Sequence, residues 1–219
     1  MRAGILGGTF DPVHFGHLRA AEEVAEAFEL SSVIFIPAAK PPHKEERELT
    51  PFNHRWRMLE LALASNPRFV LSDVEHRRPG KSYSVETLTQ LLSDYGFDAH
   101  LYFILGFDAF LALPTWHRYR DLFSLCHFVV VARPGYFLAE LDRMLHTSVS
   151  ELYRFDEQMQ EFVHPGHRPV HVRQVTLMDI SSSKIRELLV RGRSVTYLLP
   201  VGVEAYIREQ GLYGSRQNS

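Results

Sequence analysis

Four short segments of this sequence are apolar throughout, at residues 3–6, 33–36, 101–105 and 128–131. Strands that are apolar on both faces are typical of a parallel sheet covered by helices on each side. Amphipathic helical patterns alternate with these segments, as expected for consecutive β-α-β units with right-handed crossovers. These helical patterns lie at 15–29, 53–64 and 85–92. The sequence therefore predicts an α/β, Rossmann-like fold of three layers around a mostly parallel sheet.

The second half of the chain gives weaker signals. Between residues 139 and 168, Leu141, Met144 and Leu145 allow a helix, and the His-Pro-Gly-His sequence at 164–167 predicts a loop. The elements expected after it are a strand at 170–177 and helices at 183–191 and 203–210, which end at Gly192 and Gly211. We expect one domain over residues 1–212 and a frayed tail over 213–219.

Charge and cysteine content exclude several classes of protein. The chain has 24 Lys and Arg against 26 Asp and Glu among 219 residues. A net charge of −2 argues against nonspecific binding to nucleic acid or to an anionic membrane. Cys126 is the single cysteine, which excludes an internal disulfide and a cysteine-rich zinc site.

The lengths of the apolar runs indicate whether the chain could enter a membrane or be secreted. Every apolar run is far shorter than the ~18–20 residues of a membrane span. Asp11 and His14 interrupt the N-terminal segment before a signal-peptide core can form. We therefore expect a soluble, cytoplasmic protein.

A glycine turn and two histidines follow the first predicted strand, within residues 7–17. Gly7 and Gly8 allow a ligand to approach the backbone closely, and the helix that starts there offers N–H groups suited to phosphate. His14 and His17 are three residues apart and can donate to phosphoryl oxygens. The plainer interpretation is a tight turn with two capping or surface histidines, and a metal site lacks an evident third ligand nearby. The absence of G-x-G-x-x-G and of a Walker A sequence argues against dehydrogenase and P-loop interpretations.

A second candidate phosphate site lies at residues 180–186. Ser181, Ser182 and Ser183 precede a predicted helix that also carries Lys184 and Arg186. Serine is a favoured N-cap, so a well-capped helix is the plain interpretation. Hydroxyl groups, helix N–H groups and a guanidinium would together hold an anion. Two such helix starts indicate a ligand with several phosphates.

Taken together, these segments resemble the nucleotidyltransferase superfamily. Residues 7–17 (GGTFDPVHFGH) match its T/HxGH signature, and 180–186 (ISSSKIR) resemble its ISSTxIR signature, with Ser183 in place of the usual threonine. Intervening motifs occur in the order seen in bacterial nicotinate-nucleotide adenylyltransferases, over roughly residues 1–210. They are the segments at 40–44 (KPPHK), 81–84 (KSYS), 106–108 (GFD), 114–116 (PTW) and 133–135 (RPG).

The resemblance implies a fold of the nucleotidyltransferase type and a reaction of ATP with nicotinate mononucleotide, giving nicotinate adenine dinucleotide and pyrophosphate. It implies that His14 and His17 are catalytic, and that Mg²⁺ is held mainly by substrate phosphates rather than by protein ligands. Implied contacts to ATP phosphates are Gly7, Gly8, Thr9, Phe10, Lys40, Lys44, Ser181, Ser182, Ser183 and Arg186. Implied contacts to the pyridine nucleotide are Ser84, Val85, Asp108, Trp116 and His117.

Several of these residues also have plain structural interpretations. Lys40 and Lys44 could form a solvated basic stretch, Asp108 a helix cap, and Trp116 part of the core. Other activities also stay open: transfer to nicotinamide mononucleotide or to both pyridine nucleotides, transfer to phosphopantetheine or glycerol phosphate, and nucleotide sensing without catalysis. Nucleic acid and membrane are not expected as partners, and a homo-oligomer is left open.

Overall fold

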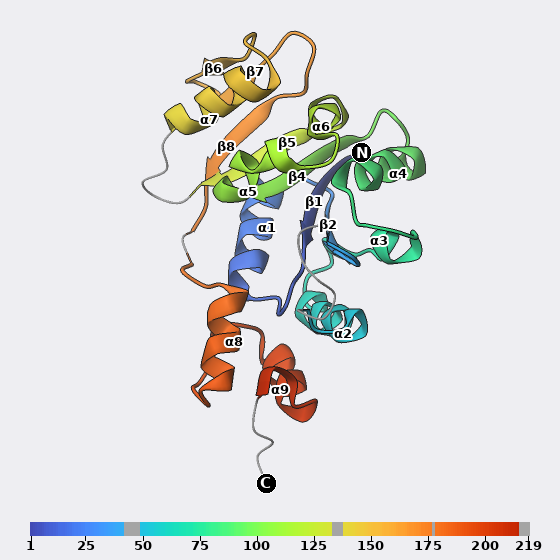
Figure 1. Ribbon diagram of the computed structural model, residues 1–219, viewed down its shortest axis with the longest axis vertical. Coiled ribbons are helices and arrows are strands. Elements are labelled where there is room, and N and C mark those ends of the chain that lie inside the picture. The colour runs from blue at the N-terminus through green and yellow to red at the C-terminus, as the bar shows by residue number, and fades with distance from the viewer. Residues whose placement is uncertain (42–48, 133–137, 177, 215–219) are drawn as a thin grey trace.

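A central sheet of eight strands organises the computed structural model, which describes residues 1–41, 49–132, 138–176 and 178–214 (Figure 1). The strand order is β3-β2-β1-β4-β5-β8-β7-β6, and the first six strands in this order are parallel. Their bounds are β1 Arg2–Gly8, β2 Ser32–Pro37, β3 Phe69–Leu71, β4 His100–Gly106, β5 His127–Ala132 and β8 Val170–Gln174. The predicted mostly parallel sheet is thus confirmed.

Helices cover both faces of the sheet and bury a separate core on each. On one face lie α1 Phe15–Ala27, α2 Phe52–Leu63, α8 Ser182–Val190 and α9 Val201–Glu209. On the other lie α3 Val74–Arg77, α4 Ser84–Tyr95, α5 Phe107–Leu111, α6 Tyr119–Leu125 and α7 Leu138–Met144. Along β4, Tyr102 and Ile104 enter the first core while Phe103 and Leu105 enter the second, because successive strand residues point to opposite faces. This arrangement confirms the three layers.

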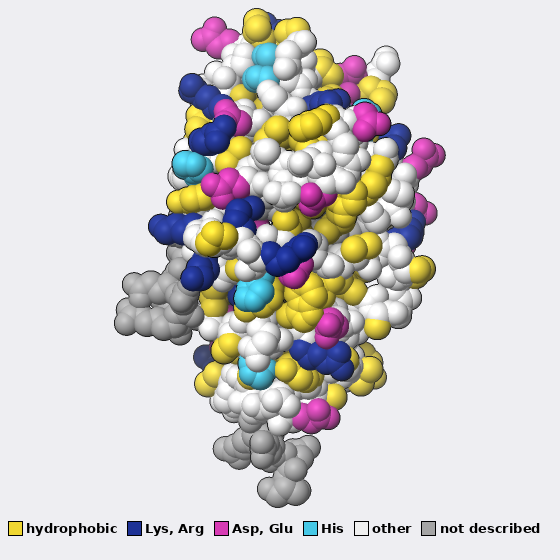
Figure 2. All heavy atoms as spheres, turned by 90° about the vertical axis from the view of Figure 1, so that its right-hand side faces the viewer, with side chains coloured by type: hydrophobic (Ala, Val, Ile, Leu, Met, Phe, Trp, Pro, Cys, Tyr) yellow, Lys and Arg dark blue, Asp and Glu magenta, His cyan; other side chains and the backbone are white. Residues whose placement is uncertain are grey.

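The outer surface over α2, α3 and α4 carries charges of both signs (Figure 2), consistent with the small net charge of the sequence. In the described part of the chain, no helix combines the length and apolar character that a membrane crossing requires.

The segment from 139 to 168 contains elements that the sequence did not reveal. After α7 come a single π-helical turn, η3 Leu145–Val149, and an antiparallel hairpin of β6 Arg154–Asp156 and β7 Glu161–Val163, which extends the sheet beyond β8. Three-residue strands are too short to show a two-residue hydrophobic period. The predicted loop at 164–167 is confirmed between β7 and β8.

Several predicted boundaries differ from the structure, and in two cases a hydrogen bond accompanies the difference. The strand expected over 170–177 ends at Gln174, because the Thr176 N–H donates to Glu23 Oε2 at 2.9 Å rather than continuing the sheet. Tyr213, assigned to the tail, belongs to a 3₁₀ turn, η4 Leu212–Gly214, and its hydroxyl donates to Asp11. Residues 215–219 of the predicted tail lie outside the described residues.

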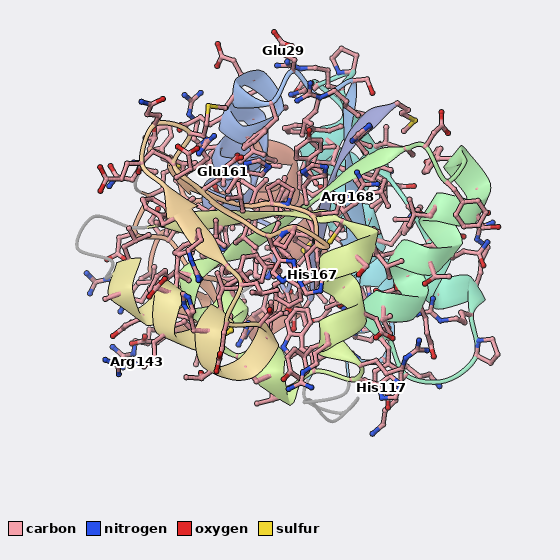
Figure 3. The ribbon with its side chains drawn as sticks, turned by 90° about the horizontal axis from the view of Figure 1, so that it is seen from above. Glu29, His117, Arg143, Glu161, His167 and Arg168 are labelled. Carbon is pink, nitrogen blue, oxygen red and sulfur yellow. The ribbon has the colours of Figure 1, made fainter. Side chains whose placement is uncertain are left out.

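Three histidines form a row across neighbouring strands. His100 Nδ1 lies 3.5 Å from His127 Nε2, and His127 Nδ1 lies 3.4 Å from His171 Nε2. The row ends at Glu161, whose Oε2 is 2.6 Å from His171 Nδ1. Figure 3 shows Glu161 on the side of the sheet that α1 covers. Burial, reinforced by the nearby charge of Arg168, lowers the pKa of His127 to about 4.

We expect this row to make the protein sensitive to acid. An unfolded histidine has a pKa of about 6.5, so below that pH the unfolded chain binds a proton that the folded His127 does not. Stability should therefore be retained above pH 6.5 and decline as the pH falls toward 4. We predict that His127→Gln reduces the loss in unfolding free energy between pH 7 and pH 5 by about 1 kcal/mol, allowing for the partial exposure of His127. Urea unfolding at both pH values measures this. His146→Gln, outside the row, is the control, and an unchanged pH dependence in His127→Gln would contradict the prediction.

Candidate active site

A cleft of about 690 Å³ opens at the carboxyl ends of β1 and β4. From these two strands the chain runs outward in opposite directions, through β2 and β3 on one side and through β5 and β8 on the other. Ligands of open α/β sheets bind at such a reversal of strand order. Leu6 and Gly7 of β1 and Leu105 and Gly106 of β4 line the cleft.

His14 and His17 stand together at the start of α1, and both line the cleft. His14 is the N-cap rather than a residue of the helix, and its ring stacks on that of His17 with centroids 3.7 Å apart. The His14 backbone N–H donates to His17 Nδ1 at 3.3 Å. Because Nδ1 accepts this bond, the neutral His17 ring carries its proton on Nε2. His17 therefore has one N–H donor available for a ligand.

Burial sets the charge of both rings. It lowers the pKa of His14 to about 4, and it lowers the pKa of His17 well below its ordinary value, with a further contribution from neighbouring His14. Both rings are thus neutral at pH 7. His14 Nδ1 is buried and has no hydrogen-bond partner among the described residues, and a Cβ on Gly16 would lie 3.1 Å from that atom. Glycine at position 16 therefore leaves room for the His14 ring.

The start of α8 forms the second wall of the cleft. Ser181 is the N-cap and accepts from the Lys184 N–H at 3.2 Å, so its plain role as a cap is confirmed. Ser181 and Ser182 also line the cleft. As the sequence led us to expect, two helix starts converge on one cavity. Their unpaired first-turn N–H groups are suited to phosphate oxygens.

Ser182 and Arg186 have a further role that the sequence did not reveal. The Ser182 hydroxyl donates to the Pro12 carbonyl at 2.8 Å, and Arg186 Nη1 donates to the Asp11 carbonyl at 2.7 Å. Arg186 Nη2 also lies 3.3 Å from Ser183 Oγ. The helix start predicted to hold phosphate therefore also holds the segment that leads into His14.

The structure assembles part of the predicted set around the cleft. The predicted residues that line it are Gly7, His14, His17, Asp108, Ser181 and Ser182. Phe10 lies outside this lining: it is buried, its ring meets the His17 ring edge-on at 5.1 Å, and it also packs on Phe35. A side chain on Gly8 would press on the Phe10 ring, because its Cβ would lie 3.3 Å from the nearest ring atom. Phe10 thus supports His17 from behind.

The residues predicted for the pyridine nucleotide come from three segments: the start of α4, residues 116–117 and the first turn of α5. Ser84 and Val85 begin α4, and His117 reaches the same place from the loop before α6, with its ring 4.4 Å from that of Tyr83 (Figure 3). Trp116 is half-buried against the core, 6.3 Å from the Phe103 ring centroid. Asp108 lies in the first turn of α5 and lines the cleft. The structure brings the α4 start and His117 together, as the prediction requires.

The predicted lysines lie near a segment that is only partly described. Lys44 lies outside the described residues, as does the motif at 133–135. Lys40 is exposed, and its backbone N–H donates to Ser82 Oγ at 3.1 Å. The Ala39 N–H donates to the same oxygen at 3.1 Å. Ser82, which received no role from the sequence, thus ties the end of the β2 segment to the start of α4.

Arg55 is a functional candidate that sequence reasoning missed. It is 2% exposed, although it lies on α2 and is charged. Its Nη1 donates to the Thr9 carbonyl and its Nε to the Thr50 carbonyl, both at 2.9 Å. The available signal was its position among apolar residues on the inward face of the predicted helix, beside Met58 and Leu59. A buried arginine side chain stabilises the structure around it only when its N–H groups have hydrogen-bond acceptors.

Comparison with known proteins agrees with this geometry. Residues 5–188 match the cytidylyltransferase-like family. The chain is 48% identical over 213 residues to a probable nicotinate-nucleotide adenylyltransferase of Geotalea uraniireducens (strain Rf4), covering 97% of this chain and 98% of that protein. It is 46% identical over 219 residues to one of Syntrophotalea carbinolica, covering both chains fully. Among solved structures, the Plasmodium falciparum nicotinic acid mononucleotide adenylyltransferase complexed with NaAD matches with a TM-score of 0.75 at 17% identity, covering 99% of each chain.

The fold and the cleft are those of a nucleotidyltransferase, and the chain belongs to the cytidylyltransferase-like family. Within that class, identity of 46–48% over nearly the whole length places it among the nicotinate-nucleotide adenylyltransferases.

Proposed function

We propose that this protein transfers the adenylyl group of ATP to nicotinate mononucleotide, a step of NAD biosynthesis. The observation that carries the proposal is the convergence of His14, His17 and the start of α8 on one cleft at the carboxyl ends of β1 and β4. The names of the full-length relatives support this choice of substrate. A release assay for pyrophosphate, with ATP and nicotinate mononucleotide, tests the activity directly.

The reaction requires placement and charge stabilisation more than acid–base chemistry. A phosphate oxygen of nicotinate mononucleotide attacks the α-phosphorus of ATP, the bond to the bridging β-phosphate oxygen breaks, and pyrophosphate leaves. The attacking oxygen is already ionised, so a strong general base is not needed. Charge develops on the α-phosphate oxygens of the transferred adenylyl group in the transition state, and fixed donors stabilise it. The neutral His17 ring, with its proton on Nε2, and the N–H groups at the α8 start are such donors.

Mg²⁺ is proposed as a cofactor carried by the substrate phosphates. Among the described residues that line the cleft, Asp108 supplies the one carboxylate, and the other polar groups are imidazoles, hydroxyls and N–H groups. Such a set fits a Mg²⁺ ion that keeps waters and phosphate oxygens as its ligands. The ion would neutralise phosphate charge. A cytoplasmic location remains a prediction from the sequence.

We predict that His17→Ala lowers kcat by about 10²- to 10³-fold, the range for a lost transition-state donor. The affinity for ATP should change much less, because the α8 start remains. Steady-state kinetics of pyrophosphate release measure both values. His146→Ala, far from the cleft on η3, is the control, and a near-normal kcat in His17→Ala would exclude the assigned role.

Arg186→Ala should act on both ATP binding and turnover. The guanidinium is proposed to bind ATP phosphates in the ground state, and it also holds the Asp11 carbonyl. We therefore expect a raised KM for ATP together with a lowered kcat. Kinetics at varied ATP concentration test this, with Arg191→Ala at the exposed end of α8 as the matched control. If both constants keep their parental values, Arg186 has a purely structural role.

The preference for nicotinate over nicotinamide is expected to come from the backbone. The first-turn N–H groups of α4, at Ser84 and Val85, have no partner within the helix. The residue before them, Tyr83, has its ring 4.4 Å from that of His117. A carboxylate can accept from such donors on every side, whereas a carboxamide points its NH₂ at one of them. Leaving a buried donor unpaired costs roughly 1–3 kcal/mol.

That penalty corresponds to about 5- to 150-fold in kcat/KM in favour of nicotinate mononucleotide. Parallel kinetics with the two mononucleotides test it. Trp116→Ala should weaken both substrates and leave most of the discrimination intact, because ring stacking barely distinguishes them. Comparable kcat/KM values for the two substrates in the parent protein would favour the dual-specificity alternative.

A further inference from the structure

Asp11 is a buried carboxylate that the reaction itself does not use. It is 2% exposed and precedes His14 by three residues. Asp11 Oδ2 accepts from the Thr50 N–H at 3.2 Å, and Asp11 Oδ1 accepts from the Tyr213 hydroxyl. A buried carboxylate is costly unless its oxygens are paired. Both oxygens of Asp11 therefore depend on donors that come from distant parts of the chain.

Tyr213 reaches Asp11 from the far end of the fold. Helix α9 is followed by Gly211 at φ +60 and by the turn η4, within which Tyr213 itself has φ 57. A tyrosine in the left-handed region is uncommon and is retained where surrounding contacts hold it. Burial raises the pKa of Tyr213, with Asp11 adding to the effect, so the hydroxyl keeps its proton and remains a donor.

The segment from Thr9 to Pro12 is held on several sides at once. Arg55 of α2 holds the Thr9 carbonyl, while Ser182 and Arg186 of α8 hold the Pro12 and Asp11 carbonyls. Each of these bonds fixes the backbone. The Asp11 side chain is a further attachment, and Tyr213 supplies one of its two donors. In Figure 1, α8 and α9 lie together beyond the end of α1 from which this segment enters the helix.

We propose that Tyr213 is a positioning residue for His14 and His17, acting through Asp11. The proposal rests on the proposed function. Tyr213 and Asp11 both lie outside the described lining of the cleft, so neither would contact substrate. Losing the hydroxyl leaves Asp11 Oδ1 buried without that donor, and the segment that carries His14 shifts or loosens. A displacement of about 1 Å at a reacting group can cost about 100-fold in rate.

The test compares Tyr213→Phe with Tyr206→Phe. Tyr206 lies on α9, and its hydroxyl is 2.8 Å from His54 Nδ1 on α2, so the control loses a bond of the same kind that does not reach residues 9–12. We expect Tyr213→Phe to lower kcat about 10-fold with the KM for ATP within about twofold of the parent, since misplacement affects the transition state most. Tyr206→Phe should keep the parental kcat.

A second readout is independent of activity. Hydrogen exchange of the peptides that cover residues 9–18 should be faster in Tyr213→Phe than in the parent, and unchanged there in Tyr206→Phe. Asp11→Asn should produce the same kinetic defect, and the double variant should be no worse than the more affected single variant, because both changes remove one interaction.

The outcomes separate this proposal from the proposed function. A parental kcat in Tyr213→Phe, or equal losses in both tyrosine variants, would overturn the positioning role. Unchanged exchange over residues 9–18 in Tyr213→Phe would overturn it as well. If the parent protein releases no pyrophosphate, the proposed function fails, and the exchange comparison still decides whether Tyr213 holds this segment.

Discussion

The reversal of strand order between β1 and β4 is the constraint on which the rest of the site depends. Since the chain leaves β1 toward β2 and leaves β4 toward β5, the connections after these two strands run to opposite sides and leave a cleft between them. Whatever lines that cleft must come from the loops at the carboxyl ends of the strands. The β1–α1 connection supplies the two histidines, and α8 closes the opening from the opposite wall.

Within the cleft, the polar groups are set before any ligand arrives. The rings of His14 and His17 are stacked and neutral, and the His14 N–H fixes the tautomer of His17. Ser182 and Arg186 are held against the carbonyls of Pro12 and Asp11. Donors that are already oriented need little rearrangement as phosphate charge develops, which is the physical basis of electrostatic stabilisation in such sites.

The sequence was informative where local chemistry determines the structure. The apolar runs identified β1, β2, β4 and β5 of the parallel sheet, and the serine run at 181–183 located the start of α8. Sequence patterns were not informative where contacts between distant parts of the chain determine the structure. Phe10 is apolar in a glycine-rich segment, and its burial against Phe35 and His17 depends on strand neighbours. The attachment of Tyr213 to Asp11 spans 202 positions, and the three-residue strands of the β6–β7 hairpin join the sheet by pairing with β8. Such contacts leave no local pattern to detect.

The distance in sequence between Asp11 and Tyr213 also has a consequence for biosynthesis. During translation the N-terminal strand and the two histidines emerge first, whereas α8 and Tyr213 emerge near the end of the described chain. Pairing residues so far apart requires closing a loop that includes most of the protein. The contacts that hold the segment carrying the histidines therefore cannot all form until α8 and Tyr213 have been synthesised. A ribosome-bound chain that lacks residues 182–213 would contain the β1–β4 cleft without its second wall. Because the start of α8 is proposed to bind phosphate, we expect such a chain to bind nucleotide only after these residues have been added.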